Sequence, residues 1–334
     1  MRIAVIGAGS WGTTLANLLA KKGLDTILWV YEADLAERLA ATRVNDLFLA
    51  GVELDPRLVF TSDLSAAVGG RQVVVLVSPS QVMRRVVAQL RPHLQPDSLL
   101  VSAAKGIEND TLLLMSEVLE EVLGGTAASR CAYLSGPSFA REVADELPTA
   151  VAVAAADGEV ARTVQELFHT DYFRVYTNPD VVGVELGGAL KNVIALAAGV
   201  SDGLGFGHNA RAALINRGLV EMARLGAAKG ARAETFAGLA GMGDLVLTCT
   251  GDLSRNRSVG IELGRGRKLA EILGGMRMVA EGVKTTLSAY QLAQKLEVDM
   301  PITEQMYQIL YNDKDPCQAV SELMLRQLRA EGRD

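Results

Sequence analysis

Residues 2–12 read RIAVIGAGSWG, a short β-branched run followed by glycines spaced as G-x-G-x-x-G. The next residues, Thr13 to Lys22, place leucines on one helical face and are followed by a glycine, so they predict a helix. A second β-branched run follows at Thr26 to Tyr31. Strand, glycine turn, helix and strand in this order predict that the chain opens with a parallel α/β sheet.

The glycines of this turn, Gly7, Gly9 and Gly12, each have a separate use in a loop that binds a dinucleotide. The first permits a tight turn, the second lets a pyrophosphate approach the backbone, and the third lets the helix lie close to the strand. Free N–H groups at the start of the helix attract phosphate anions. A glycine-rich turn without a ligand is the alternative, but it does not explain the spacing.

Glu32 follows Gly12 by 20 residues, near the end of the second predicted strand. A carboxylate there would bond the ribose hydroxyls and repel a 2′-phosphate, whereas a site for NADP usually supplies an arginine. The neighbours Tyr31 and Ala33 are not basic, so the sequence favours NAD over NADP. In the alternative interpretation, Glu32 lies one residue out of register and faces solvent.

Further apolar runs continue the alternation of strand and helix through the first half of the chain. Strands are predicted at Val73 to Val77, Leu99 to Ala103, Cys131 to Ser135 and Ala150 to Ala155, and helices at Gln81 to Leu90 and Thr111 to Leu123. This alternation predicts an α/β fold whose N-terminal domain is a doubly wound, mostly parallel sheet of the Rossmann type.

From about Val181 the pattern changes to long helical segments. They are predicted over Val184 to Val200, Asn209 to Lys229, Ala233 to Leu239, Arg257 to Gly264, Leu269 to Leu273, Lys284 to Leu296, Ile302 to Tyr311 and Pro316 to Arg329. We therefore predict a dinucleotide-binding domain at 1–182 and an all-α, substrate-binding domain at 183–334, with punctuation at Asn178-Pro179-Asp180. The cleft between the two domains is the expected ligand site.

Composition excludes several other classes of protein. The net charge of −6 and the 5% of aromatic residues disfavour a nucleic-acid binder. Three scattered cysteines predict neither a disulfide framework nor a metal site. The first strand leaves no room for a signal peptide, and the apolar stretches are interrupted by Lys191 or by glycines before the length of a membrane span, so we expect a cytoplasmic protein without a membrane partner.

Two polar residues, Lys191 and Asn192, interrupt a segment that is otherwise apolar nearly all round, from Val184 to Val200. A buried lysine has a lowered pKa, which suits a general base. The alternative is a lysine whose head reaches solvent at a domain edge. A second apolar stretch, residues 241–250, contains Asp244 and Thr248.

Residues 254–257 read SRNR, which places hydroxyl, guanidinium and amide donors just before a predicted helix. This set can hold a phosphate through side chains and helix N–H groups together. The alternative is that the arginines are surface charges and Ser254 is an N-cap. In the first half, Lys105-Gly106 and residues 135–140 follow predicted strands, where an α/β sheet binds its ligands.

In this order, these motifs resemble the NAD(P)-dependent glycerol-3-phosphate dehydrogenase family over nearly the whole chain. The matching elements are GAGSWG (7–12), Lys105-Gly106, SGPSFA (135–140), GGALKNV (187–193), GMGDLVLTCT (241–250), SRNR (254–257), VAEG (279–282) and MPITEQMYQILY (300–311). The resemblance implies a Rossmann domain followed by a helical domain, a small phosphorylated substrate, and a homodimer by analogy.

The resemblance also implies a role for individual residues. Lys191 would accept the C2 hydroxyl proton of glycerol 3-phosphate, with Lys105 and Asp244 beside the reacting oxygen and Thr248 as a further contact. Substrate contacts would come from Lys105, Gly136, Ser138, Lys191, Asn192, Asp244, Ser254, Arg255 and Asn256. Cofactor contacts would come from Gly7, Gly9, Ser10, Trp11, Gly12, Tyr31, Glu32, Lys105, Ala140, Arg255, Val279 and Glu281.

The resemblance further implies that the enzyme supplies glycerol 3-phosphate for phospholipid synthesis. Bacterial members often carry a basic residue where this chain has Tyr31, which again favours NAD. Two other functions remain open at this point: a hydroxyacid or sugar-acid dehydrogenase of the same build, and a non-catalytic sensor that binds the dinucleotide. The first would not need a phosphate site, and the second would leave Lys191 and Asp244 unexplained.

Overall fold

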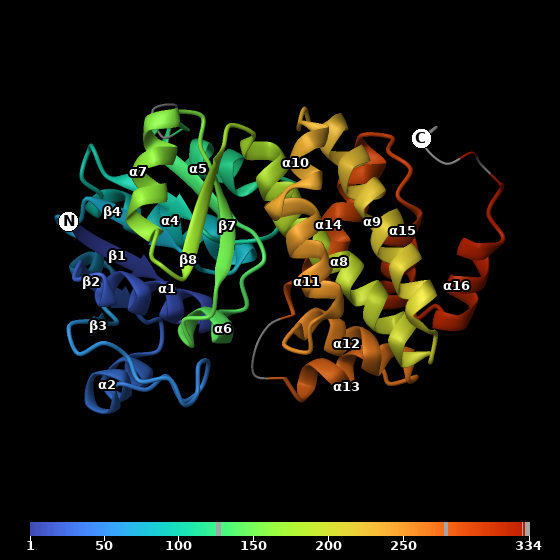
Figure 1. The fold of residues 1–334 in the computed structure, drawn as a ribbon, viewed down its shortest axis with the longest axis horizontal. Coiled ribbons are helices and arrows are strands. Elements are labelled where there is room, and N and C mark those ends of the chain that lie inside the picture. The colour runs from blue at the N-terminus through green and yellow to red at the C-terminus, as the bar shows by residue number, and fades with distance from the viewer. Residues whose placement is uncertain (125–127, 277–279, 329, 331–334) are drawn as a thin grey trace.

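The structure, a computed structural model, describes residues 1–124, 128–276, 280–328 and 330, which form an α/β lobe and a helical lobe (Figure 1). An eight-stranded sheet forms the first lobe, with strand order β3-β2-β1-β4-β5-β6-β7-β8. The strands are β1 (Arg2–Ile6), β2 (Asp25–Trp29), β3 (Val59–Thr61), β4 (Val73–Leu76), β5 (Leu99–Ser102), β6 (Cys131–Ser135), β7 (Thr149–Ala154) and β8 (Phe173–Asn178). All neighbours pair in parallel except β6 and β7.

Helices cover both faces of this sheet. They are α1 (Ser10–Lys21), α2 (Ala33–Thr42), α3 (Leu64–Val68), α4 (Met83–Leu90), α5 (Met115–Leu123), α6 (Ala140–Ala144) and α7 (Gly158–Phe168), with short 3₁₀ turns at Ser80–Val82, Arg91–His93 and Ala128–Arg130. Ile3 and Val5 of β1 belong to the core under α1 and α7, whereas Ala4 and Ile6 belong to the core under α4 and α5. The alternation follows from the two-residue repeat of a strand, and burial on both faces explains the apolar sequence.

Helices joined by loops form the second lobe, which contains no strand among its described residues. Its helices are α8 (Val181–Gly203), α9 (His208–Ala228), α10 (Ala233–Ala237), α11 (Asp244–Thr250), α12 (Arg255–Gly264), α13 (Leu269–Gly274), α14 (Glu281–Lys295), α15 (Pro301–Tyr311) and α16 (Pro316–Met324), with a π-helical turn at Leu239–Gly243. The predicted fold class, a doubly wound domain followed by an all-α domain, is confirmed.

Helix α8 lies at the centre of the helical lobe, and glycines let α12 approach it closely (Figure 1). A Cβ atom on Gly199 would lie 2.1 Å from the Arg257 carbonyl oxygen, and one on Gly260 would lie 2.1 Å from the Leu196 carbonyl oxygen. Only hydrogen fits at these positions, so the two backbones touch. The contact brings the first residues of α12 alongside the polar residues in the middle of α8.

The expectation that no apolar stretch reaches the length of a membrane span was wrong. Helix α8 is 23 residues long and, by length and composition, could cross a membrane, because neither its glycines nor Lys191 interrupt the helix. However, 89% of its apolar window is buried inside the fold, as expected of a core helix.

Several element boundaries differ from the prediction. Helix α1 begins at Ser10 rather than Thr13, α5 at Met115 rather than Thr111, and α16 ends at Met324 rather than Arg329. Strands β3 and β8, which lie at the two edges of the sheet, were not predicted. Their side chains alternate between buried and exposed or are partly exposed, so neither strand is a continuous apolar run.

Candidate active site

Lys191 lies in the middle of α8, where its ammonium group is enclosed by polar side chains of α11. The residue is 7% exposed. Its Nζ atom donates to Thr248 Oγ1 at 2.9 Å and forms an ion pair with Asp244 Oδ1. Asp244 begins α11 directly after the π-helical turn and is 1% exposed. Lys191 is therefore buried and paired, and its ammonium group does not reach solvent at a domain edge.

Lys105 reaches the same carboxylate from the other lobe. It follows β5, and its Nζ atom lies 2.6 Å from Asp244 Oδ2 and 3.1 Å from the Gly136 carbonyl oxygen. Asp244 is therefore held between two ammonium groups, one from each lobe. The pair also fixes the carboxyl ends of β5 and β6 against α11, which is where an α/β sheet binds its ligands.

Burial and charge act together on this cluster. Burial lowers the pKa of Lys191, the negative charge of Asp244 opposes this shift, and the positive charge of Lys105 adds to it; the combined result is a pKa of about 8. Burial alone would raise the pKa of Asp244, but the two ammonium groups outweigh it and hold that pKa below its ordinary value. At neutral pH the carboxylate is charged, and Lys191 is close to the point at which it can exchange a proton.

The glycine turn after β1 has the shape that a pyrophosphate needs. Gly7 has a φ of +117°, and a Cβ atom on Gly12 would lie 1.9 Å from the Gly7 carbonyl oxygen, so both positions require glycine. A Cβ atom on Gly9 would meet nothing within 4 Å, so the backbone there is open to an approaching ligand. Helix α1 has neither a side-chain N-cap nor an acidic residue in its first turn, which leaves its N–H groups and dipole available to an anion.

The other predicted cofactor contacts lie around this turn or between the lobes. Ser10 donates to the Phe48 carbonyl oxygen at 2.5 Å, and the ring of Trp11 lies 6.3 Å from that of Phe173. Ala140 begins α6, and its carbonyl oxygen accepts the Thr14 hydroxyl at 3.1 Å. Val279 lies outside the described residues.

Tyr31 and Glu32 are both exposed at the end of β2. The Tyr31 side chain is 71% exposed and meets Trp29 edge-on, with ring centroids 6.0 Å apart. Glu32 is the N-cap residue of α2, but its side chain makes no capping hydrogen bond. The Glu32 carboxylate is therefore not used by the helix that it precedes.

The predicted substrate residues form two groups beside the lysines. Ser138 donates to the Gly136 carbonyl oxygen at 3.0 Å, next to Lys105. Asn256 donates from its side-chain nitrogen to Asn192 Oδ1 at 2.9 Å, and its own Oδ1 accepts the Gly282 N–H at 3.0 Å. The amides thus join α8, α12 and the start of α14 immediately beside Lys191.

The four donors of SRNR do not act as one set. Ser254 is the N-cap of α12 and accepts the Arg257 N–H at 3.2 Å, as the alternative interpretation had it. Arg257 points elsewhere, because it is paired with Asp202 at 2.8 Å and with Asp252 at 3.0 Å. Arg255 remains exposed. Burial raises the pKa of the Glu281 carboxyl, and the positive charge of Arg255 opposes that shift.

The loop after β4, which also borders the glycine turn, was not predicted as part of the site. A Cβ atom on Gly7 would lie 3.2 Å from the Ser78 nitrogen. Strand β4 is the neighbour of β1 on the side where the strand order reverses, so its carboxyl end belongs to the crevice. The apolar run at Val73 to Val77 could have predicted this, because the residues that follow a central parallel strand lie in the ligand crevice at its carboxyl end.

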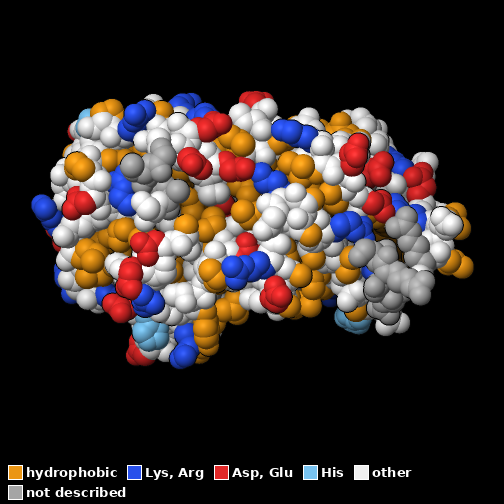
Figure 2. Space-filling view, turned by 90° about the horizontal axis from the view of Figure 1, so that it is seen from above, with side chains coloured by type: hydrophobic (Ala, Val, Ile, Leu, Met, Phe, Trp, Pro, Cys, Tyr) orange, Lys and Arg blue, Asp and Glu red, His pale blue; other side chains and the backbone are white. Residues whose placement is uncertain are grey.

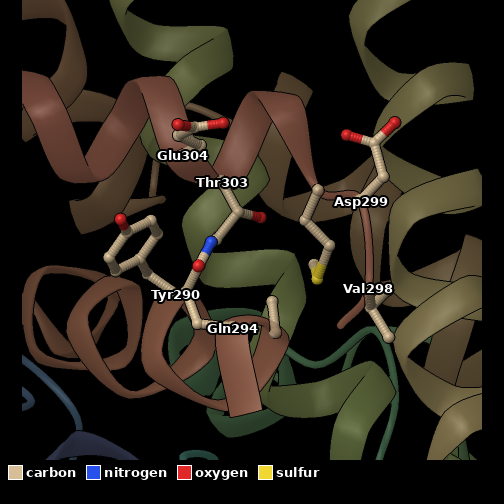
Figure 3. A pocket seen from close by; sticks show the side chains of 8 residues that line it. Tyr290, Gln294, Val298, Asp299, Thr303 and Glu304 are labelled. Carbon is tan, nitrogen blue, oxygen red and sulfur yellow. The ribbon is translucent and has the colours of Figure 1, made fainter. Parts of the chain in front are cut away.

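A separate hollow lies between α14 and α15 (Figure 3). It is lined by Tyr290, Gln294, Asp299, Thr303 and Glu304 among others, and it shares no residue with the cluster around Asp244. On the face shown in Figure 2, basic and acidic side chains are interspersed. Across the described residues, no three His, Cys, Asp or Glu side chains gather as a metal site would require.

Both halves of the chain match models of one protein family. Residues 2–161 match the model of the NAD-dependent glycerol-3-phosphate dehydrogenase N-terminus, and residues 180–321 match that of its C-terminus. The chain is 66% identical to the glycerol-3-phosphate dehydrogenase [NAD(P)+] of Syntrophotalea carbinolica, over 99% of both chains. It is 67% identical to that of Geobacter sulfurreducens, over 99% of this chain and 98% of the relative.

The solved structures agree. The crystal structure of glycerol-3-phosphate dehydrogenase from Coxiella burnetii superposes with a TM-score of 0.93 at 42% sequence identity, and the match covers 97% of this chain and 99% of the other. Both lobes, and not the α/β lobe alone, are therefore shared with these proteins.

Proposed function

The chain belongs to the NAD-dependent glycerol-3-phosphate dehydrogenase family, and on that premise we propose that it interconverts sn-glycerol 3-phosphate and dihydroxyacetone phosphate. The predictions of the family, of an oxidoreductase and of NAD(P) as cofactor are confirmed by these matches. One observation supports the proposed reaction above all: a buried lysine, a carboxylate and a second lysine meet where the two lobes touch.

We assign the proton transfer to Lys191. In the oxidation its neutral amine accepts the proton of the C2 hydroxyl, and in the reduction its ammonium returns that proton. The nicotinamide ring supplies the hydride acceptor or donor at C2 when bound. Asp244 and Thr248 hold the Lys191 nitrogen from two sides, which fixes the direction of its remaining hydrogen or lone pair.

Lys105 has an electrostatic role in this proposal. In the reduction a negative charge develops on the C2 oxygen, and two ammonium groups beside that oxygen stabilise it. Asp244 neutralises part of their charge, which keeps the buried Lys191 and the partly buried Lys105 compatible with the fold. Because the lysines come from different lobes, the charged site is complete only where the lobes meet.

We further propose that the open turn at Gly7, Gly9 and Gly12, with the N-terminus of α1, holds the pyrophosphate of the dinucleotide. Of the remaining predicted cofactor contacts, Glu32 would bind the adenosine ribose. The arginines near β3 are engaged elsewhere: Arg43 lies 5.3 Å above the Phe60 ring, and Arg57 is paired with Asp55 at 2.7 Å. This arrangement supports NAD as the preferred cofactor.

The proposal is tested by the reduction of dihydroxyacetone phosphate with NADH and NADPH in parallel, followed spectrophotometrically. We expect turnover with kcat/KM about tenfold or more higher for NADH, because the Glu32 carboxylate repels a 2′-phosphate and each tenfold corresponds to about 1.4 kcal/mol. A preference for NADPH would contradict the assignment of Glu32. Turnover of hydroxyacids or sugar acids instead, or cofactor binding without turnover, would favour one of the two other functions.

We assign the substrate phosphate to the exposed Arg255 and the buried Asn256, at the start of α12. Arg255→Ala is expected to raise KM for dihydroxyacetone phosphate by about tenfold or more, since a hydrogen bond to a charged group contributes about 1.5–3 kcal/mol. Arg265→Ala, at the other end of the same helix, is the matched control, because Arg265 is paired only with Glu262 among the described residues. An unchanged KM for Arg255→Ala would overturn the phosphate assignment.

The broader expectations stay proposals. We propose a division into domains at 1–182 and 183–334, since β8 ends at Asn178 and α8 begins at Val181. We also propose a homodimer in the cytoplasm that supplies glycerol 3-phosphate for phospholipid synthesis, with no nucleic-acid or membrane partner. Family membership and the net charge of −6 support this setting.

A further inference from the structure

The loop that presents Lys105 is held from both lobes at one backbone atom. The carbonyl oxygen of Ile107, two residues after Lys105, accepts the Gln81 side-chain amide at 2.7 Å and the Ser288 hydroxyl at 3.2 Å. Gln81 belongs to the turn after β4, whereas Ser288 lies in α14 of the helical lobe. Ile107 and Ser288 are both 0% exposed, so the bond between them is shielded from water.

Gln81 holds the loop at a second point. Its Oε1 atom accepts the Asn109 N–H at 3.0 Å, so a single side chain binds the backbone on both sides of Glu108. The loop also has no room to slide, because a Cβ atom on Gly106 would lie 2.2 Å from the Ser80 hydroxyl oxygen. The turn after β4 therefore defines where the backbone of the Lys105 loop lies.

We propose that Gln81, together with Ser288, is a positioning residue that sets the Lys105 ammonium against Asp244. The Lys105 side chain extends from this fixed backbone to the Asp244 carboxylate, where Nζ lies 2.6 Å from Oδ2. The position of the backbone therefore determines where the ammonium group lies. Neither Gln81 nor Ser288 acts on the substrate; each acts through the Lys105 loop. The inference rests on the proposed function, because it takes its meaning from the role of Lys105 there.

Displacement of Lys105 would change the pKa of Lys191. Among the described residues, the charged and titratable groups that act electrostatically on Lys191 include Asp244 and Cys249 of α11, Lys105 of the other lobe, and Glu281 at the start of α14, on which Arg255 also acts. Lys105 is the group among them that lowers the pKa of Lys191 through its positive charge. If the Lys105 ammonium moves away, the pKa of Lys191 rises, and a higher pH is needed to form the neutral base.

The experiment measures glycerol 3-phosphate oxidation against pH for Gln81→Met, Ser288→Ala and Lys105→Met. Gln165→Met is the matched control, because Gln165 also donates one amide bond to a backbone carbonyl, that of Val175 at 2.8 Å, but stands in α7 away from the lysines. We expect Gln81→Met to lower kcat by about tenfold to 100-fold, as a misplacement of about 1 Å can do. KM for NAD should stay within about twofold of the value for the unmodified chain. The alkaline midpoint, which is the pH at which the oxidation rate reaches half of its maximum, should move upward, in the same direction as in Lys105→Met.

Ser288→Ala removes a single hydroxyl and is expected to move the midpoint in the same direction by a smaller amount, which keeps the test valid if Gln81→Met folds poorly. A midpoint in both variants equal to that of Gln165→Met, with a clear shift in Lys105→Met, would overturn the positioning role and leave the proposed function intact. If Lys105→Met changed neither kcat nor the midpoint, Lys105 would have no part in the reaction, and the positioning role of Gln81 and Ser288 would be wrong as well.

Discussion

Lys191→Ala is expected to lose about 100- to 10,000-fold in kcat in both directions, the range that general acid–base catalysis typically contributes. This loss corresponds to about 3–5 kcal/mol in the activation free energy. The physical reason is that Lys191 is the buried amine at the meeting point of the lobes, and its pKa is lowered to about 8, so that it can exchange a proton near neutral pH. Affinity for NADH should change little, because the glycine turn that we assign to the pyrophosphate lies between β1 and α1, in the other lobe.

The measurement is steady-state kinetics in both directions together with a binding titration of NADH. Lys295→Ala provides the control, since Lys295 is exposed at the end of α14. Activity of Lys191→Ala within about tenfold of the unmodified chain would show that another group transfers the proton. Loss of NADH binding along with turnover would show instead that the substitution disturbs the fold.

The pH dependence of the unmodified chain follows from the same residue. Burial lowers the pKa of Lys191 to about 8, so its neutral form predominates above that pH and its ammonium below it. Oxidation requires the neutral amine and should therefore gain rate as the pH rises through about 8. Reduction requires the ammonium and should lose rate over the same interval.

Local sequence was enough to predict the parts of the site that depend on one segment. The glycine turn could be predicted because Gly7 and Gly12 are required by backbone geometry within a few residues. Lys191 stood out because an amine in an apolar helix must be paired or used. These signals do not depend on how the rest of the chain folds.

Contacts between distant segments could not be predicted in this way. The residues pairing with Asp244 come from α8 and from the loop after β5, 53 and 139 residues away in the chain, and no periodicity encodes that meeting. Arg257 shows the reverse case, since its partner Asp202 at the end of α8 withdraws it from the predicted phosphate site. The family resemblance supplied what the residues alone could not.

Asp244→Asn is expected to lose about 100-fold or more in kcat and to be destabilised by about 3–5 kcal/mol near neutral pH, the typical cost of removing one partner from a buried ion pair. The carboxylate faces Lys191 and Lys105 and is 1% exposed, so its loss leaves two neighbouring ammonium groups without their counter-charge. Each lysine can escape this cost only by releasing its proton.

The direction of the pH effects separates this prediction from simple damage to the fold. Asp244 raises the pKa of Lys191, so its replacement by a neutral amide should lower that pKa and move the alkaline midpoint of oxidation downward, opposite to the shift expected for Lys105→Met. The loss of stability should be largest at low pH, where both lysines stay charged, and should shrink as the pH rises and they deprotonate. Thermal unfolding and rate profiles between about pH 6 and 10 measure both, with the exposed Asp313→Asn as control. A stability loss independent of pH, or an upward midpoint, would mean that Asp244 does not set the protonation of Lys191.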